Sequence, residues 1–214
     1  MPPKDPPPGH QLSCSVYIIG PQSTGKTTLV NALAGVFGRD VPIIREVARG
    51  VMAEKGYSKV DVDSNDQERK FSMQQDIFTA QVEAESAFLN PTQHRSFLSD
   101  RSAIDPLIYL RRYSGTANLD RLTSTDLWNA VRDRYRDTTK SLFFLLLPVE
   151  DFLVDDDIRY VPKSLEDWYA LAEEFRSFMV EERIPFCEIG AECLELENRI
   201  QLVLSKLLPS SEAL

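Results

Sequence analysis

Gly20-Pro21-Gln22-Ser23-Thr24-Gly25-Lys26-Thr27-Thr28 is the stretch that decides the fold of this chain. It matches the pattern G-x-x-x-x-G-K-[ST], which is typical of a loop that binds phosphate groups. The apolar run 13–19 precedes the loop and predicts a buried strand, and Leu29, Val30 and Leu33 follow it at helical spacing. A strand, a glycine loop and a helix in this order are the context that the pattern requires.

Each residue type in this loop has a physical role in holding a phosphate. Gly20 and Gly25 permit main-chain conformations that a Cβ atom would obstruct, so successive N–H groups can turn toward one anion. The helix that begins near Lys26 directs the positive end of its dipole at the same anion. The Lys26 ammonium can reach the β and γ phosphates, and the Thr27 hydroxyl can bind Mg²⁺. Residues 20–28 are therefore predicted to bind ATP or GTP with Mg²⁺; the alternative is an ordinary glycine turn.

Length and composition favour one globular domain. The chain has 214 residues, of which 43% are hydrophobic and 27% charged, so we expect a single domain at 13–208. Residues 1–12 are rich in proline and predict a disordered tail, which is either passive or able to dock a protein partner. Residues 209–214 are expected to be a flexible C-terminus. No run of 18 apolar residues occurs, so we expect no membrane span.

The charge and the cysteines narrow the function classes further. The formal net charge of -9 argues against a protein that coats nucleic acid, although a local basic cleft would still be compatible with it. Cys14, Cys187 and Cys193 are odd in number and lack the spacing of metal ligands. Cys14 and Cys187 are expected to be buried in apolar strands. Together these features favour a reducing, intracellular compartment, and we expect a cytoplasmic protein.

Two charged side chains follow the second predicted strand, at 41–44. Glu46 and Arg49 come directly after this short apolar run and would lie at the carboxyl end of the strand. In open α/β sheets that edge binds the ligands, so both residues are candidates for contact with a substrate. A surface ion pair at the start of a helix is the alternative. The polar residues 51–65 are predicted to be irregular.

A third apolar run, at 96–99, ends in Asp100 and Arg101. An aspartate in this position would lie beside the phosphate loop, where it can bind Mg²⁺ or accept a proton. Arg101 could neutralise phosphate or substrate charge, whereas a solvated Asp–Arg turn is the alternative. Asp105 and Pro106 then predict the start of a helix, with aspartate as N-cap and proline at the first position.

Helices and strands alternate along the rest of the chain. Helices are predicted from a capping box at Ser64 to Asn90, over 119–136 with a break near 123–124, from Ser164 to about 180, and over 196–207; strands are predicted at 141–147 and 184–189. This alternation indicates an α/β fold, a parallel sheet with helices on both faces. The acidic segment 151–162 is either a mobile lid that brings Arg159 onto the phosphates or an inert loop.

These pieces together resemble a known family. Neither the base-reading motif of regulatory GTPases nor the acidic pair of ring-forming AAA+ machines occurs. The loop at 20–28, Glu46-Val47-Ala48-Arg49, Asp100-Arg101-Ser102, the loop around Arg159, and Ile189-Gly190 resemble the NadR-type AAA domain, a P-loop group that contains ribosylnicotinamide kinase domains. The Asp-Arg-Ser string also resembles a motif of deoxynucleoside kinases. The resemblance implies a three-layer P-loop NTPase fold like that of mononucleotide kinases, with strand order 2-3-1-4-5.

The resemblance also implies a reaction, the transfer of the γ-phosphoryl group of ATP to a hydroxyl of a small nucleoside-like metabolite. Lys26 would hold the β and γ phosphates, and Thr27 with Asp100 would bind Mg²⁺. Glu46 or Asp100 would orient or deprotonate the acceptor hydroxyl. This predicts Lys26, Glu46 and Asp100 as catalytic residues, together with Arg159 as a cation that closes over the transferring group.

Two further expectations concern substrate contacts, and two alternative functions stay open. Arg49 and Arg101, with Glu46, would bind the substrate, and the loop after Ile189 would contact the nucleobase. A nucleotide-binding regulatory or adaptor protein with little turnover is the main alternative, and a collapsed acceptor pocket would favour it. A polynucleotide-end kinase is a third possibility, which requires a basic groove leading to Asp100.

Overall fold

A five-stranded parallel sheet forms the centre of the molecule. The computed structural model describes residues 12–38, 40–89, 95–150 and 164–207. The strand order is β2-β3-β1-β4-β5 and every neighbouring pair is parallel, which confirms the predicted fold. The strands are β1 (Ser15–Ile19), β2 (Ile43–Ile44), β3 (Leu98–Asp100), β4 (Ser141–Leu146) and β5 (Phe186–Ile189).

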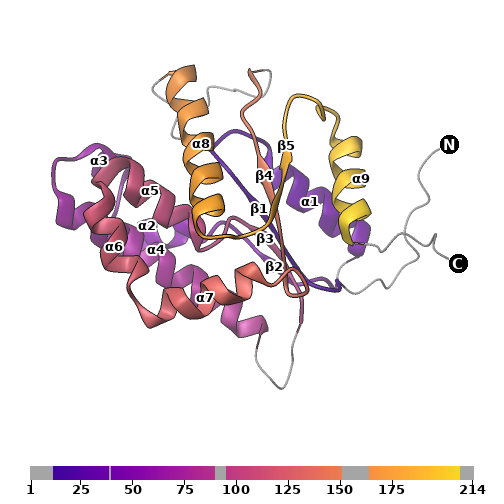
Figure 1. Ribbon diagram of the computed structural model, residues 1–214, viewed down its shortest axis with the longest axis horizontal. Helices are drawn as coiled ribbons and strands as arrows, with labels where there is room; N and C mark the ends of the chain where they lie inside the picture. Colours follow the sequence, from indigo (N-terminus) through magenta and orange to yellow (C-terminus); the bar gives the residue numbers. More distant parts are fainter. Residues whose placement is uncertain (1–11, 39, 90–94, 151–163, 208–214) are drawn as a thin grey trace, which may run out of the picture.

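Helices cover both faces of this sheet. Figure 1 shows α1 and α9 on one side of the sheet and the larger group, α4 to α8, on the other. The two helices of the first group are α1 (Lys26–Phe37) and α9 (Leu196–Leu207). The others are α2 (Ala48–Lys55), α3 (Lys59–Asp63), α4 (Gln67–Phe88), α5 (Ile104–Ser114), α6 (Thr116–Thr123), α7 (Asp126–Arg136) and α8 (Leu165–Glu181).

The strict alternation of side chains in β1 divides the core into two halves. Val16 and Ile18 point to the α1/α9 side, where they belong to one apolar cluster with Leu33. Tyr17 points to the other side and joins a cluster that includes Trp128. All four of these β1 and α1 side chains are fully buried, because a parallel sheet with helices on both faces exposes neither surface of its central strand.

The sequence predicted an irregular segment at 51–65, but the structure shows most of α2 and all of α3 there. Gly56 ends α2 in a left-handed conformation, with φ of 67°. Ser58 and Asp61 then form a reciprocal capping box that starts α3. The prediction was wrong because neither helix presents a long apolar stripe; both depend on short-range capping, and the Arg69 side chain adds bonds to Asp61 and to the Gly56 carbonyl.

Two helix starts also differ from their predicted positions. Asp66, and not Ser64, caps α4, since its side chain accepts from the Arg69 main-chain N–H at 2.9 Å. Asp105 lies inside the first turn of α5 instead of capping it, and Ala103 occupies the cap. The Asp105 carboxylate still stabilises the start of α5, because the Ser102 main-chain N–H donates to it at 2.9 Å.

Other predicted elements are confirmed with small shifts. The break in 119–136 separates α6 from α7, and Ser164 caps α8 by accepting from the Asp167 N–H. Strand β2 is shorter than predicted, and Cys14 lies just before β1 although it is buried. Cys187 is only half-buried in β5, because this strand is at the edge of the sheet.

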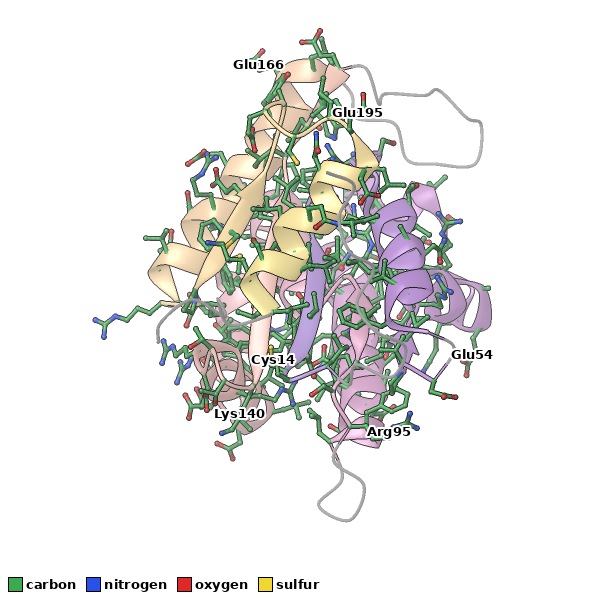
Figure 2. The ribbon with its side chains drawn as sticks, turned by 90° about the vertical axis from the view of Figure 1, so that its right-hand side faces the viewer. Cys14, Glu54, Arg95, Lys140, Glu166 and Glu195 are labelled. Atoms are coloured by element: carbon green, nitrogen blue, oxygen red, sulfur yellow. The ribbon has the colours of Figure 1, made fainter. Side chains whose placement is uncertain are left out.

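The carboxyl ends of the strands meet at one end of the molecule. In Figure 2, Glu166 and Glu195 lie at that end, whereas Lys140 and Arg95, which precede β4 and β3, lie at the opposite end. The loop after β1, with its predicted phosphate-binding motif, is therefore at the end where open α/β sheets bind ligands. Across the ranges that the structure describes, no helix has the length and apolar character needed to cross a membrane.

Candidate functional site

The loop between β1 and α1 turns back on itself through unusual main-chain conformations. Gly20, Ser23 and Gly25 have φ values of 129°, 60° and 87°. Within the turn, the Thr24 hydroxyl and the Lys26 ammonium both donate to the Pro21 carbonyl, at 3.0 and 2.5 Å. Positive φ values alternating with ordinary ones turn successive N–H groups toward one point, which is the geometry of an anion-binding nest. The predicted phosphate-binding loop thus has the required shape.

Gly20→Ala is expected to lower the free energy of unfolding by about 2 kcal/mol. A Cβ atom there would lie 2.4 Å from the Leu146 carbonyl oxygen, and φ of +129° is strained for any other residue. Gly35→Ala is the matched control: it lies in α1 with nothing within 4 Å of its Cβ, and should gain up to about 1 kcal/mol. Urea unfolding of the three proteins measures both effects; equal stabilities would contradict the close approach.

Three side chains from distant parts of the chain hold this loop in place. Trp168 of α8 donates its indole N–H to the Gln22 carbonyl at 2.8 Å, and the Tyr109 hydroxyl of α5 donates to the Gln22 side-chain oxygen at 3.1 Å. Arg199 of α9 donates to the Thr24 carbonyl at 3.1 Å. The sequence analysis missed these contacts. Arg199 carried a signal, since it is a charged residue on the apolar stripe of its helix and is 3% exposed.

Thr27 and Asp100 meet beside the loop. The Thr27 hydroxyl donates to the Asp100 carboxylate at 2.5 Å. Both groups are hard oxygen ligands of the kind that Mg²⁺ prefers, and Mg²⁺ usually takes one or two protein ligands plus water and substrate phosphates. No cluster of three or more acidic, histidine or cysteine side chains suited to a metal occurs among the described residues. The pair therefore fits a magnesium ion that arrives with a nucleotide, better than it fits a permanently bound metal.

Arg101 joins two carboxylates next to this pair. Its Nε donates to Glu46 at 2.7 Å and its Nη1 to Asp105 at 3.1 Å, and Glu46 also accepts from Arg49 at 2.8 Å. Partial burial works against ionisation of Glu46, but the charges of Arg101 and Arg49 outweigh it and lower the pKa of Glu46. Burial raises the pKa of Asp105 in spite of Arg101. Arg101 has φ of 81°, so its main chain is itself held in a sparsely populated conformation.

Lys26 is buried within the same charged group. Burial, together with the neighbouring Arg101 charge, lowers the pKa of Lys26 to about 7. Only 6% of its surface is exposed, and among the described residues its ammonium contacts loop oxygens and no carboxylate. A buried ammonium without a carboxylate partner at contact distance is poorly compensated, and an anion placed in the loop would stabilise its charged form.

One cavity of about 440 Å³ connects these groups. At one end it is lined by the phosphate loop, and in the middle by the carboxylate and arginine groups around Asp100. The rest of its lining, here called the chamber, comes from α2 to α5 and is mostly apolar. The lining residues there are Met52, Val62, Met73, Gln74, Ile77, Gln81, Pro106 and Tyr109, of which Tyr109 also reaches the phosphate loop. An apolar chamber with a few converging polar groups is the usual form of a small-molecule site.

A family model matches most of the chain. It is described as an AAA domain and it matches residues 15–195, which include the phosphate loop and the whole sheet. The chain belongs to this AAA-domain family. The resemblance deduced from the sequence is thereby confirmed at the level of the family. No curated protein matches the chain.

Solved structures share the fold of this AAA domain at low sequence identity. NadR protein in complex with NR has a TM-score of 0.66 and 21% identity over 92% of this chain, which spans only 52% of the NadR chain. Deoxyadenosine kinase from M. mycoides with bound dATP has a TM-score of 0.60 and 18% identity, covering 92% and 99%. Thymidylate kinase from Ehrlichia chaffeensis has a TM-score of 0.53 and 17% identity, covering 93% and 98%. At such identities the likeness establishes the P-loop kinase fold alone.

The AAA domain brings most of the predicted site residues together. The cavity is lined by Gln22, Ser23, Gly25, Lys26, Thr27, Thr28, Glu46, Arg49, Asp100 and Arg101. Gly20, Pro21 and Thr24 shape the loop without lining the cavity. Glu46 and Arg49 do form an ion pair, as the alternative interpretation held, but the pair faces the cavity. Arg159 lies outside the described residues.

The loop after Ile189 does not line this cavity. Its predicted contact with a nucleobase therefore stays a prediction. The structure does connect it to the phosphate loop, because Arg199 donates both to the Cys193 carbonyl, at 2.7 Å, and to Thr24.

Proposed function

We propose that this protein is an ATP- and Mg²⁺-dependent kinase that transfers the γ-phosphoryl group to a hydroxyl of a small nucleoside-like metabolite. The observation that carries the proposal is the continuous cavity. Its lining joins the phosphate loop, the charged group around Glu46 and Arg101, and the mostly apolar chamber, and its total volume of about 440 Å³ is that of a small-molecule site. Such an arrangement would bring the hydroxyl of a bound metabolite next to the terminal phosphate of a nucleotide.

The nucleotide end of the cavity would work mainly through charge. Lys26 and the loop amides would bind the β and γ phosphates, in place of the contact that Lys26 makes with the Pro21 carbonyl. Thr27 and Asp100 would hold Mg²⁺, which supplies positive charge to the phosphates when bound. Arg49 and Arg101 would neutralise charge on the substrate side. ATP is the nucleotide we propose, with GTP as the other candidate.

Glu46 is the group we assign to the acceptor hydroxyl. Asp100 already contacts the Thr27 hydroxyl in the magnesium pair, whereas Glu46 projects between Arg49 and Arg101 on the acceptor side. The lowered pKa of Glu46 keeps it ionised at neutral pH, so it can accept a hydrogen bond from the hydroxyl and orient it. The loosely bonded transition state of phosphoryl transfer needs this positioning more than a strong base.

Glu46→Gln is expected to lower kcat by about tenfold to 10²-fold, while the affinity for nucleotide stays unchanged. The amide keeps the size of the side chain but cannot compensate Arg101 and orients the hydroxyl less well. Steady-state kinetics and nucleotide titrations measure the two quantities. Glu54→Gln, an exposed change on α2, the helix that follows Glu46, serves as control. A variant that loses nucleotide affinity and keeps its kcat would contradict the assignment.

Incubation of the purified protein with ATP, Mg²⁺ and a panel of nucleosides that includes ribosylnicotinamide tests the function directly. Formation of a phosphorylated nucleoside, detected by mass spectrometry, is the expected result. Nucleotide binding without any product would favour the second candidate, a regulatory or adaptor protein with little turnover. The open, ordered cavity gives that candidate less support than a collapsed one would. The acidic groups Glu46 and Asp105 next to Asp100 likewise give little support to a polynucleotide-end kinase.

A further inference from the structure

Two buried carboxamides on α4 face the cavity. Gln74 and Gln81 are only 7% and 1% exposed, and both line the chamber. They are two turns apart on one face of the helix; Gln81 lies against Ser99 of β3, and Gln74 lies two turns closer to the start of α4. A buried polar group normally has a hydrogen-bond partner, so the partners of these amides decide what the chamber can bind.

The amide of Gln81 is held in one orientation by Glu85. Its Nε2 donates to the Glu85 carboxylate at 2.9 Å and to the Ser99 hydroxyl at 3.2 Å. Glu85 also accepts from the hydroxyls of Tyr17 and Tyr135 and pairs with a guanidinium, so it is surrounded by donors and acts as an acceptor. The amide nitrogen must therefore point at Glu85. The Gln81 oxygen accepts from no described residue and remains an acceptor for a ligand.

Gln74 makes no hydrogen bond with any described residue, although 93% of its surface is covered by its neighbours. The cavity residues around it on α4 are Met73 and Ile77, and Tyr109 of α5 lines the same chamber. Lys70 lies beside Gln74 in a small adjoining hollow, but it donates to the Tyr113 carbonyl at 3.0 Å and leaves the amide without a described partner. Gln74 thus offers both a donor and an acceptor to whatever occupies the chamber.

Among the described residues, no unpaired carboxylate lines the cavity beside Gln74 and Gln81. The carboxylates in the described lining are Glu46, Asp100 and Asp105; the first and third are paired with Arg101, and the second belongs to the magnesium pair. Beside Gln74 the charged residue of the described part is Lys70, a cation that donates to the Tyr113 carbonyl in a small adjoining hollow. Behind Gln81, the Glu85 carboxylate is fully buried and paired with Arg134. A permanently cationic ring would lose hydration there without a compensating anion, whereas an uncharged ring would not.

We propose that the chamber selects an acceptor whose ring is uncharged and carries both a hydrogen-bond donor and an acceptor, and that it discriminates against a cationic ring. This inference rests on the proposed function, because it assumes that the chamber holds the acceptor. Gln74 contacts the edge of the ring, and Gln81 accepts from a hydroxyl nearer to the phosphate loop. Ribosylnicotinamide, whose pyridinium ring is cationic, is then a poor acceptor, and nucleosides with uncharged heterocycles are good ones.

The test compares the binding of ligands that differ in ring charge. Ribosylnicotinamide, its reduced dihydro form, which has a nearly identical shape but no charge, and the common uncharged nucleosides are titrated calorimetrically into the full chain with a non-hydrolysable ATP analogue and Mg²⁺. We expect at least one uncharged ligand to bind ten times or more tighter than ribosylnicotinamide. If ribosylnicotinamide binds as tightly as every uncharged ligand, or if none of them binds, the inference is overturned.

Variants at Gln74 test the assigned residue itself. Gln74→Glu keeps the shape but adds a carboxylate, so it should shift the preference at least tenfold toward ribosylnicotinamide. Gln75→Glu, an exposed neighbour on the same helix, should leave the preference unchanged. Gln74→Met adds no charge and should weaken binding of the preferred uncharged ligand about tenfold. This second variant tests the residue even if Gln74→Glu does not fold. Unchanged preferences in both Gln74 variants would overturn the role of this residue.

Turnover separates this inference from the proposed function. Phosphorylation of ribosylnicotinamide in preference to every uncharged nucleoside would support a kinase and overturn the neutral-ring selectivity. Selective binding of uncharged nucleosides without any phosphorylation would support the selectivity and contradict the kinase.

Discussion

Lys26→Ala is expected to lower phosphoryl transfer by about 10²- to 10³-fold and to weaken nucleotide binding strongly. The ammonium is buried and lies within the phosphate loop, where its hydrogen-bond partners among the described residues are loop oxygens. Alanine would leave the loop with its amides but without the point charge that the β and γ phosphates require. Coupled assays of ATP consumption and nucleotide titrations would measure the two losses.

Lys55→Ala is the matched control for this substitution. Lys55 is an exposed lysine in the last turn of α2, where its nearest acidic contact is Asp76 at 3.9 Å. An exposed ion pair at this distance contributes little to the stability of the fold, so the control should retain both activity and nucleotide affinity. If Lys26→Ala matched the control in turnover, the phosphate loop would not be the catalytic centre and the kinase proposal would fail.

Glu85→Ala is expected to lower the free energy of unfolding by about 3 to 5 kcal/mol. Glu85 is fully buried and accepts from Tyr17, Tyr135 and Gln81 as well as from Arg134. Burial raises the pKa of this carboxyl, and the charge of Arg134 acts in the opposite direction. Alanine would leave a cavity and several buried donors without an acceptor, and each of these is destabilising.

Thermal unfolding measures this effect. For a domain of this size, a loss of 3 to 5 kcal/mol corresponds to a fall in Tm of roughly 6 to 20 °C. Glu83→Ala, an exposed change two residues away on α4, should shift Tm by no more than a degree or two. A small shift for Glu85→Ala would show that its hydrogen-bond network does not stabilise the fold.

The parts of the fold that follow a strong local pattern were predictable from the sequence. The phosphate loop, the apolar run at 141–147 and the capped amphipathic helix from Ser164 all appear at or near their expected positions. The helices α2 and α3 were missed because they lack an apolar stripe. They depend on the left-handed Gly56 and on the Ser58–Asp61 capping box, and both are signals that could have been read from the sequence.

The site was predictable only where its residues directly follow strands. Glu46, Asp100 and Arg101 do so, and the structure places them in the cavity. Gln74 and Gln81 were overlooked because the apolar residues of α4 suggested an ordinary core-facing stripe. Both glutamines lie on that stripe, three residues after a buried phenylalanine. A polar residue on a buried face is unusual enough to mark a candidate contact even without a structure.

The sequence by itself determined the phosphate loop, the parallel α/β architecture and the edge of the sheet at which ligands bind, because each follows from a local pattern: the loop motif, the apolar runs of the strands and their alternation with helices. Only the tertiary structure decided which distant side chains complete the site. Tyr109, Trp168 and Arg199 meet the phosphate loop through packing between helices that are far apart in sequence. Which polar atoms stay unpaired in a cavity likewise depends on every neighbour at once, and no local pattern specifies it.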